Sequence, residues 1–249
     1  MNGKVMLVTG GSRGIGAAIA RAAGRAGYLV GVNYHRSEEA ALAVVAGIER
    51  AGGQAVALQA DVGRLPEVVD LFARLDQALG RVDVLVNNAG LLANFRVDAL
   101  DADALAAVFQ ANVFSMFHCA GEAVRRMSTA HGGPGGAIVN LSSVASRLGG
   151  LAGGAAYAAS KGAVDSFTLA LAKEVGREGI RVNALRPGLI ATEIHQAHGG
   201  LAQMERLAAT AVPLGRSGSA DEVADAVLWL ASDAASYVHG AVIDVAGGR

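Results

Sequence analysis

Residues 5–16 read VMLVTGGSRGIG, and this segment decides the fold. Its first four residues form an apolar run typical of a buried strand, and a helical pattern starts at Ile15. Glycines at a strand-to-helix turn permit a tight bend and let backbone N–H groups approach a pyrophosphate at the positive end of the helix. Gly10, Gly14 and Gly16 give the spacing G-x-x-x-G-x-G, which differs from the commoner G-x-G-x-x-G. A plain turn is the alternative, but the strand before and the helix after favour a dinucleotide-binding loop.

The rest of the chain continues this alternation of apolar runs and helical patterns. Runs typical of strands occur at residues 5–8, 29–32, 55–58, 82–86, 137–141, 180–185 and 241–245. Helical patterns occur at residues 15–26, 37–51, 65–79, 102–127, 156–178 and 220–231. Strands separated by helices imply right-handed βαβ crossovers and a parallel sheet covered on both faces. We therefore expect an α/β fold in which residues 1–249 form a single domain, a Rossmann-like doubly wound parallel sheet of about seven strands.

Composition narrows the class of protein. The chain has 249 residues, 52% hydrophobic and 4% aromatic, which suits Ala- and Gly-rich helices packed closely on a parallel sheet. The net charge of -1, without a basic stripe, gives no reason to expect a nucleic-acid partner. No apolar run approaches the roughly 18 residues of a membrane helix and no signal-peptide pattern is present, so we expect a cytoplasmic protein without a membrane partner. Cys119 is the only cysteine, which excludes an intrachain disulfide and is typical of a small buried residue.

The end of the second apolar run bears on which dinucleotide binds. An NAD site places Asp or Glu about twenty residues after the glycine loop, where the carboxylate accepts from the ribose 2′-OH. This sequence instead reads Asn33, Tyr34, His35 and Arg36. A guanidinium favours the 2′-phosphate of NADP because it can bind it bidentately, and Arg13 in the glycine loop could supply a second positive charge. We expect NADP(H) as the preferred cofactor and NAD(H) as the alternative; solvated surface arginines are the structural alternative.

Tyr157 and Lys161 form the strongest local signal for catalysis. They stand four residues apart at the start of a helical pattern, so the ammonium lies beside the phenol on one helix face. A free phenol has a pKa of about 10 and is a poor base at neutral pH. A nearby cation favours phenolate and lowers that pKa, and oxidised nicotinamide adds another positive charge. A tyrosine tuned in this way can protonate a forming alkoxide or deprotonate an alcohol.

Ser143 and Asn112 add specificity to this pair. Ser143 follows the run at residues 137–141, at the edge of the sheet where such folds bind ligands. Its hydroxyl could hydrogen-bond the substrate oxygen as charge develops there. A helix cap or turn is the other role for a serine at this place, and we assign that role to Ser142. Asn112 lies inside a helical pattern, where Asn is unfavourable, and could hold a water that links Lys161 to solvent.

The sequence resembles the short-chain dehydrogenase/reductase family along essentially its whole length, and within it the glucose-dehydrogenase-like and 3-oxoacyl-carrier-protein-reductase-like branch. The resemblance rests on Thr9-Gly10-x-x-x-Gly14-x-Gly16, Asp61-Val62, Asn87-Asn88-Ala89-Gly90, the set Asn112, Ser143, Tyr157 and Lys161, and Pro187-Gly188-x-x-x-Thr192. It implies cofactor contacts from Gly10, Ser12, Arg13, Gly14, Ile15, Gly16, Tyr34, His35, Arg36, Asp61, Val62, Asn88, Ala89, Gly90, Tyr157, Lys161, Pro187, Gly188, Ile190 and Thr192.

The resemblance also implies roles for the catalytic set. Tyr157 is expected to be the general acid/base, and Lys161 to lower its pKa and bind the nicotinamide ribose. Ser143 is expected to orient the carbonyl, and Asn112 to support a proton relay. A homo-oligomer, usually a tetramer, is implied as well, formed through the helices at residues 102–127 and 156–178 and the C-terminal strand.

Two departures from the family's pattern stand out. The segment at residues 146–156 is one residue longer than in many acyl-carrier-protein reductases, which argues against that substrate. Ala246 stands where Asp is common, and we expect an effect on the terminus only. Residues 190–214 are expected to cover a modest pocket, with residues 149–154 opposite.

Glu193, His195 and His198 could suggest a metal site, but no fourth ligand accompanies them and a solvated lid surface is the better interpretation. Trp229 is expected in the core or in an interface. The sequence thus predicts an NADP(H)-dependent oxidoreductase acting on a small carbonyl or alcohol, with reduction of a ketone or aldehyde favoured. Sugar or polyol oxidation, reduction of a 3-oxoacyl thioester and a noncatalytic dinucleotide-sensing protein are the alternatives.

Overall fold

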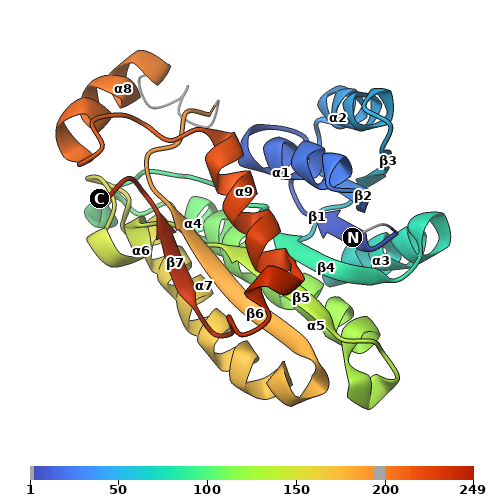
Figure 1. Ribbon diagram of the computed structural model, residues 1–249. Coiled ribbons are helices and arrows are strands. Elements are labelled where there is room, and N and C mark those ends of the chain that lie inside the picture. The colour runs from blue at the N-terminus through green and yellow to red at the C-terminus, as the bar shows by residue number, and fades with distance from the viewer. Residues whose placement is uncertain (1–2, 193–199) are drawn as a thin grey trace.

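In the computed structural model, which describes residues 3–192 and 200–249, the chain forms one parallel sheet of seven strands covered by helices (Figure 1). The strands are β1 (Val5–Val8), β2 (Leu29–Tyr34), β3 (Gln54–Gln59), β4 (Val82–Asn87), β5 (Gly136–Leu141), β6 (Ile180–Pro187) and β7 (Val242–Val245). Their order is β3-β2-β1-β4-β5-β6-β7, and this confirms the predicted doubly wound fold. The order reverses between β1 and β4, so ligands of this architecture bind beyond the carboxyl ends of those strands.

Helices cover both faces of the sheet. One face carries α1 (Gly14–Arg25), α2 (Glu38–Arg50) and α9 (Ala220–Ala231). The other carries α3 (Leu65–Leu79), α5 (Ser115–Met127) and α7 (Ala155–Val175). Successive strand residues point to opposite faces, so Met6 packs in the first layer and Leu7 in the second. Because both faces are buried, the strands are apolar at nearly every position, as predicted.

Three further helices complete the fold. They are α4 (Ala102–Phe109), α6 (Ala145–Leu148) and α8 (Gly200–Ala211). Helix α6 packs on α7, whereas α8 lies apart from the two main layers (Figure 1). The sequence did not predict α6, because four residues are too few to show a helical period.

The helix predicted at residues 102–127 is interrupted by a π-turn, η2 (Gln110–Phe114), between α4 and α5. Asn112 lies in this turn. Among the described residues, Ala102–Met127 is the one helical stretch long and apolar enough to cross a membrane by length and composition. Its side chains Cys119, Ala120 and Ala123 are buried against the sheet, whereas Phe114 and Phe117 are exposed, so core packing explains part of that composition.

Two single residues can be compared with their predictions. Cys119 is fully buried, and burial raises the pKa of its thiol, which confirms the prediction of a small apolar core residue. Trp229 was predicted to lie in the core or in an interface. It lies on α9 and is 43% exposed, so it is not a core residue, and an interface stays the prediction.

Candidate active site

The glycine loop between β1 and α1 has no room for side chains. Gly10 and Gly14 have φ values of 60° and 54°, which favour glycine. A Cβ on Gly16 would lie 2.3 Å from the carbonyl oxygen of Gly10. Helix α1 begins at Gly14 after Arg13, whose side chain does not cap it. The first N–H groups of α1 are therefore open to an anion, which fits the pyrophosphate of a dinucleotide.

The loop is held by the end of β4. Asn88 Nδ2 donates to the carbonyl oxygens of Thr9 and Gly10 at 2.9 and 3.1 Å. Thr9 Oγ1 accepts from the backbone N–H groups of Asn88 and Ala89 at 2.9 and 3.0 Å. Asn88 and Ala89, predicted as cofactor contacts, thus shape the loop that faces the cofactor. Gly90 follows these residues and lies beside Lys161.

Asn33 was missed as a site residue by sequence reasoning. Its side chain is buried at the end of β2, where Oδ1 accepts from the Gly10 N–H at 3.2 Å. Nδ2 donates to the carbonyl oxygens of Leu58 and Ala60 at 3.2 and 3.1 Å. One side chain therefore fixes the glycine loop to two strands. The sequence did contain a signal for Asn33, since it is a polar residue near the end of an apolar strand.

A pocket of about 290 Å³ lies between the starts of α1 and α2. It is lined by Ser12, Arg13, Gly14, Ala17, Arg21, Ser37, Ala40 and Ala43. Arg13 lines it as predicted, whereas His35 and Arg36 are exposed and lie outside this lining. Arg21 lines it and was missed. No acidic side chain pairs with Arg13 or Arg21 in residues 3–192 and 200–249.

Three other predicted cofactor residues near this end have structural contacts. Tyr34 is buried in the core beside α1 and α2, and not in the pocket. Asp61 Oδ1 accepts from the Gly63 N–H at 3.0 Å, which closes a local turn. Val62 is buried against the opposite layer. The side chains of Tyr34 and Val62 therefore contribute to packing, and their contacts with the cofactor stay a prediction.

Ser143, Tyr157 and Lys161 meet beyond the carboxyl end of β5. Ser143 lies near enough to the phenol of Tyr157 to act on its pKa as a hydrogen-bonding side chain. The Lys161 ammonium lies over the tyrosine ring, with Nζ 5.7 Å from the ring centroid. Nζ also donates to the carbonyl oxygen of Leu141 at 2.7 Å. The structure thus brings together the three side chains that the sequence grouped.

The side-chain interaction with a local turn, which was predicted for Ser142, is made by Ser143. Ser143 Oγ accepts from the Ala145 N–H at 3.1 Å and so caps the start of α6. Ser142 Oγ donates to the carbonyl oxygen of Lys161 at 3.1 Å, which links β5 to α7. The assignment of the turn to Ser142 is wrong, and Ser143 combines the turn with its position beside the Tyr157 phenol.

The protein groups around Tyr157 do not lower its pKa on balance. Burial raises the pKa of the phenol, and the hydrogen-bonding side chain of Ser143 opposes this by less. Burial also lowers the pKa of Lys161 to about 8, against the effect of the Asp165 charge. The predicted net lowering of the Tyr157 pKa is therefore not seen in the protein without its cofactor, because burial of the phenol outweighs the groups that favour phenolate.

Asn112 joins three elements. Its Oδ1 accepts from the Leu91 N–H at 2.6 Å, and Nδ2 donates to the Leu91 carbonyl oxygen at 3.0 Å and to Ser160 Oγ at 2.9 Å. Both amide hydrogens are thus used by the loop after β4 and by α7. The predicted water could therefore bind this side chain only by donating to the second lone pair of Oδ1. A Cβ on Gly90 would lie 3.2 Å from Oδ1 and 3.6 Å from Lys161 Nζ, so this glycine separates the two groups.

The predicted cofactor segment after β6 faces the glycine loop. Pro187 ends β6, and Ile190 and Thr192 are buried. The Thr192 side chain lies 3.7 Å from the place of a Cβ on Gly14. The segment at residues 187–192 therefore lies against the first turn of α1.

Ala246, the departure from the family's pattern, packs on this segment. The Gly188 N–H donates to the Val245 carbonyl oxygen at 3.0 Å. A Cβ on Gly188 would lie 2.8 Å from Ala246 Cα. The expectation that Ala246 affects only the terminus is wrong, because it contacts a predicted cofactor residue.

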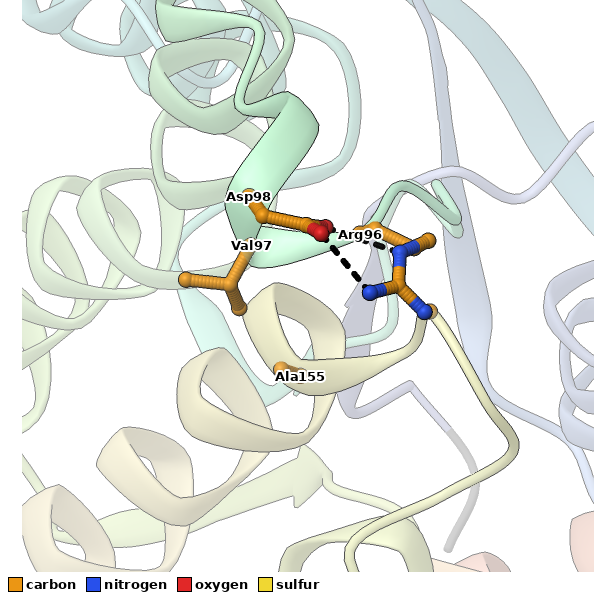
Figure 2. A pocket seen from close by; sticks show the side chains of 5 residues that line it. Arg96, Val97, Asp98 and Ala155 are labelled. Atoms are coloured by element: carbon orange, nitrogen blue, oxygen red, sulfur yellow. Dashed lines mark hydrogen bonds and ion pairs between the residues drawn. The ribbon is translucent and has the colours of Figure 1, made fainter.

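A second pocket, of about 500 Å³, lies beside the first turn of α7 (Figure 2). It is lined by Arg96, Val97, Asp98, Gly153 and Ala155. Two contacts of 2.8 and 2.7 Å pair the Arg96 guanidinium with Asp98, and so neutralise its charge. Gly153 belongs to the segment predicted to line the pocket, whereas residues 96–98 were missed. They come from an irregular stretch without a periodic signal.

No group of three His, Cys, Asp or Glu side chains that could hold a metal ion occurs in the described residues. Glu193, His195 and His198, considered in the sequence as a metal set, lie outside those residues. Of the predicted lid at residues 190–214, the structure describes 190–192 and 200–214.

Comparisons with known proteins agree with this arrangement. The family model described as "Enoyl-(Acyl carrier protein) reductase" matches residues 10–249. "Uncharacterized oxidoreductase YgfF" of Escherichia coli strain K12 is 48% identical over 246 residues, which are 98% of this chain and 99% of that protein. A solved short-chain dehydrogenase/reductase double mutant from Serratia marcescens is 33% identical with a TM-score of 0.90, over 99% of this chain and 98% of its own. A gluconate 5-dehydrogenase from Burkholderia cenocepacia, solved with NADP and tartrate, is 34% identical with a TM-score of 0.91, over 100% and 95%.

The fold, the glycine loop and these relatives define an NAD(P)-dependent oxidoreductase that acts on small molecules. The chain belongs to the short-chain dehydrogenase/reductase family, as its sequence motifs indicated.

Proposed function

We propose that the protein is an NADP(H)-dependent reductase of a small ketone or aldehyde, with Tyr157 as the general acid/base. The observation that carries this proposal is the meeting of Ser143, Tyr157 and Lys161 at the same edge of the sheet as the glycine loop. The bound dinucleotide supplies the hydride and, when oxidised, a positive charge.

The residues of the chain account for the proton. The Ser143 hydroxyl is placed to donate to the carbonyl oxygen as negative charge develops on it. Burial raises the pKa of Tyr157, which keeps the proton on the phenol until that oxygen becomes basic enough to take it. Lys161 favours the phenolate that remains, because its ammonium is charged below a pH of about 8. A raised pKa of Tyr157 favours reduction at neutral pH.

Two features support NADP(H) over NAD(H). No carboxylate ends β2, where a ribose 2′-OH would need an acceptor. Arg13 and Arg21 line the pocket between α1 and α2, and their charges suit a phosphate. We expect NAD(H) to be used more weakly.

A paired screen tests this function. Purified protein is assayed with NADPH or NADH on a panel of ketones and aldehydes, and with NADP or NAD on glucose, gluconate and other alcohols. We expect reduction with NADPH at pH 7 to exceed every oxidation. Turnover only on sugars or polyols would favour the second candidate, which the similarity to a gluconate 5-dehydrogenase supports. Tight NADPH binding with no turnover on either panel would instead indicate a dinucleotide-sensing protein.

We further propose a cytoplasmic homotetramer. Phe114 and Phe117 are 48% and 53% exposed on the helix at residues 110–127, and Leu169 of α7 is 45% exposed. The Phe117 ring lies 4.3 Å from that of Phe167, so these aromatic side chains join the two helices into one apolar surface. The unpaired, buried Cys119 suits a reducing compartment. Light scattering should give four times the 25.0 kDa chain mass, and a monomer at micromolar concentration would contradict the tetramer.

A further inference from the structure

Asp165 lies one turn after Lys161 on α7, and it has no part in the proposed catalysis or cofactor binding. Both side chains are buried, at 9% and 5% exposure. Side chains on a helix tilt toward its N-terminus, so the Asp165 carboxylate leans toward the turn that carries Lys161. A buried carboxylate is costly unless it is paired, and its partners therefore indicate its role.

Arg186 on β6 holds one oxygen of this carboxylate. Arg186 Nε donates to Asp165 Oδ2 at 3.0 Å, and Nη2 lies 2.9 Å from the same oxygen. Asp165 Oδ1 is buried and has no hydrogen-bond partner within residues 3–192 and 200–249. Arg186 thus gives the buried carboxylate a paired positive charge at one oxygen, while the other oxygen has no partner in the described residues.

Further ion pairs lead from Arg186 to the serine side of the site. Arg186 Nη1 lies 3.5 Å from Asp244 Oδ1 on β7, and Asp244 Oδ2 lies 3.0 Å from Arg147 Nη2 on α6. Helix α6 begins at the turn that Ser143 caps. Charges of alternating sign therefore connect the helix of Lys161 with the helix that follows Ser143.

The other neighbours of Lys161 carry no negative charge. Tyr157 shares its helix, and β5 offers the carbonyl oxygen of Leu141. The π-turn and the loop after β4 bring Asn112 and Gly90, neither of which titrates. Among the described residues, Asp165 is the acidic group that acts on the ammonium, and it raises the pKa of Lys161 against the effect of burial.

We propose that Asp165, fixed by Arg186, is a positioning residue that holds the buried Lys161 ammonium in its charged form. The effect of Asp165 on turnover rests on the proposed function, in which Lys161 must carry its charge when Tyr157 gives up its proton. The charge of Lys161 itself can be measured without substrate or cofactor.

Nuclear magnetic resonance of labelled lysine measures this charge directly. The chain has three lysines, so protein labelled with ¹³C at lysine Cε gives few signals, and Lys4→Arg and Lys173→Arg assign them. In the unsubstituted protein Lys161 is expected to titrate near pH 8. In Asp165→Asn it is expected to titrate about one pH unit lower or more. Asp225→Asn, which removes an exposed carboxylate from α9, is the matched control and should leave the titration unchanged.

Activity gives the second readout. In Asp165→Asn the high-pH limb of the NADPH-dependent rate should move to lower pH by the same amount, with NADPH affinity unchanged. If the stranded Arg186 charge prevents folding, Asp165→Asn/Arg186→Gln removes both charges and takes its place, with the melting temperature as the check. An unaltered Lys161 titration in a folded variant would overturn the proposal, even if turnover fell. A shifted titration in a protein that reduces no carbonyl would support Asp165 and contradict the proposed function.

Discussion

The two ends of the predicted cofactor site are built in different ways. At the end after β5, Lys161 is buried, and Ser143 and Tyr157 are partly buried beside it. At the end beside α2, Arg13 and Arg21 are exposed, and neither forms an ion pair within the described residues. A change in the interior alters stability and chemistry together, whereas a change of an exposed arginine alters binding alone. Catalysis is thus coupled to the fold, and cofactor choice is nearly independent of it.

Tyr157→Phe should have the largest effect on the buried end. It removes the hydroxyl that carries the proton and leaves the ring that packs beneath Lys161. Turnover with NADPH is expected to fall about 10³-fold, with the affinity for NADPH unchanged. Steady-state kinetics and the fluorescence of bound NADPH measure the two quantities. Rates near those of the unsubstituted enzyme would remove Tyr157 from the mechanism.

Lys161→Met tests whether the buried charge costs stability. Burial lowers the pKa of Lys161 from 10.5 to about 8, so the folded state carries the charge at a cost below that pH. The variant should therefore have a free energy of unfolding at pH 7 higher by roughly 1–3 kcal/mol, without turnover.

The cost of burying the Lys161 charge falls as the pH rises in the unsubstituted protein. Between pH 8 and 10.5 the unfolded chain binds the lysine proton that the folded chain has lost, so stability from this group rises with pH. Urea unfolding at pH 7 and pH 10 should show the advantage of Lys161→Met shrinking at the higher pH. A variant less stable at both pH values would show that the ammonium stabilises the fold.

Asn33→Ala should affect both stability and cofactor binding, because Asn33 joins the glycine loop to the core. It leaves the Gly10 N–H and the Leu58 and Ala60 carbonyl oxygens without this partner. The free energy of unfolding should fall by about 1–3 kcal/mol, and NADPH should bind more weakly. Denaturant unfolding measures the first effect. Gln54→Ala, at the exposed start of β3, is the control and should change neither quantity.

Arg13→Ala should have the smallest effect, and only on cofactor choice. The ratio of kcat/KM for NADPH to that for NADH should fall about tenfold, because one charge-assisted contact to the 2′-phosphate is lost. The melting temperature should not change, since the side chain is exposed. Arg36→Ala is the matched comparison and should do less, because Arg36 does not line the pocket. An equal loss with both cofactors would place Arg13 elsewhere than at the 2′-phosphate.

The fold and the proximity of Ser143, Tyr157 and Lys161 could be predicted because their signals are local. An apolar run such as residues 5–8 identifies a strand without knowledge of its neighbours, and the spacing of Tyr157 and Lys161 places them on one helix face. The role of Asn33 depends on the register between β2 and β3, where it reaches Leu58 and Ala60. Such a register is set by the whole sheet and cannot be read from one segment.

The electrostatics of the site were the least predictable part. Whether Lys161 lowers the pKa of Tyr157 depends on which part of the ring it faces and on the burial of both groups. The pairing of Asp165 with Arg186 joins residues 21 positions apart on a helix and a strand. Sequence spacing gives neither distances nor burial, and pKa values depend on both.

The π-turn at residues 110–114 shifts the apolar pattern of the helix that contains it, and such a shift can be detected in a sequence. Each residue of an α-helix advances the side chain by about 100°, so a turn with one extra residue rotates everything after it by that amount. Cys119 and Ala123 meet the sheet only in this rotated frame, and deletion of a single residue from the turn would point them toward solvent. A step in the phase of an apolar pattern, with a polar residue at the step, can therefore locate an inward-facing site in a helix from the amino-acid sequence alone.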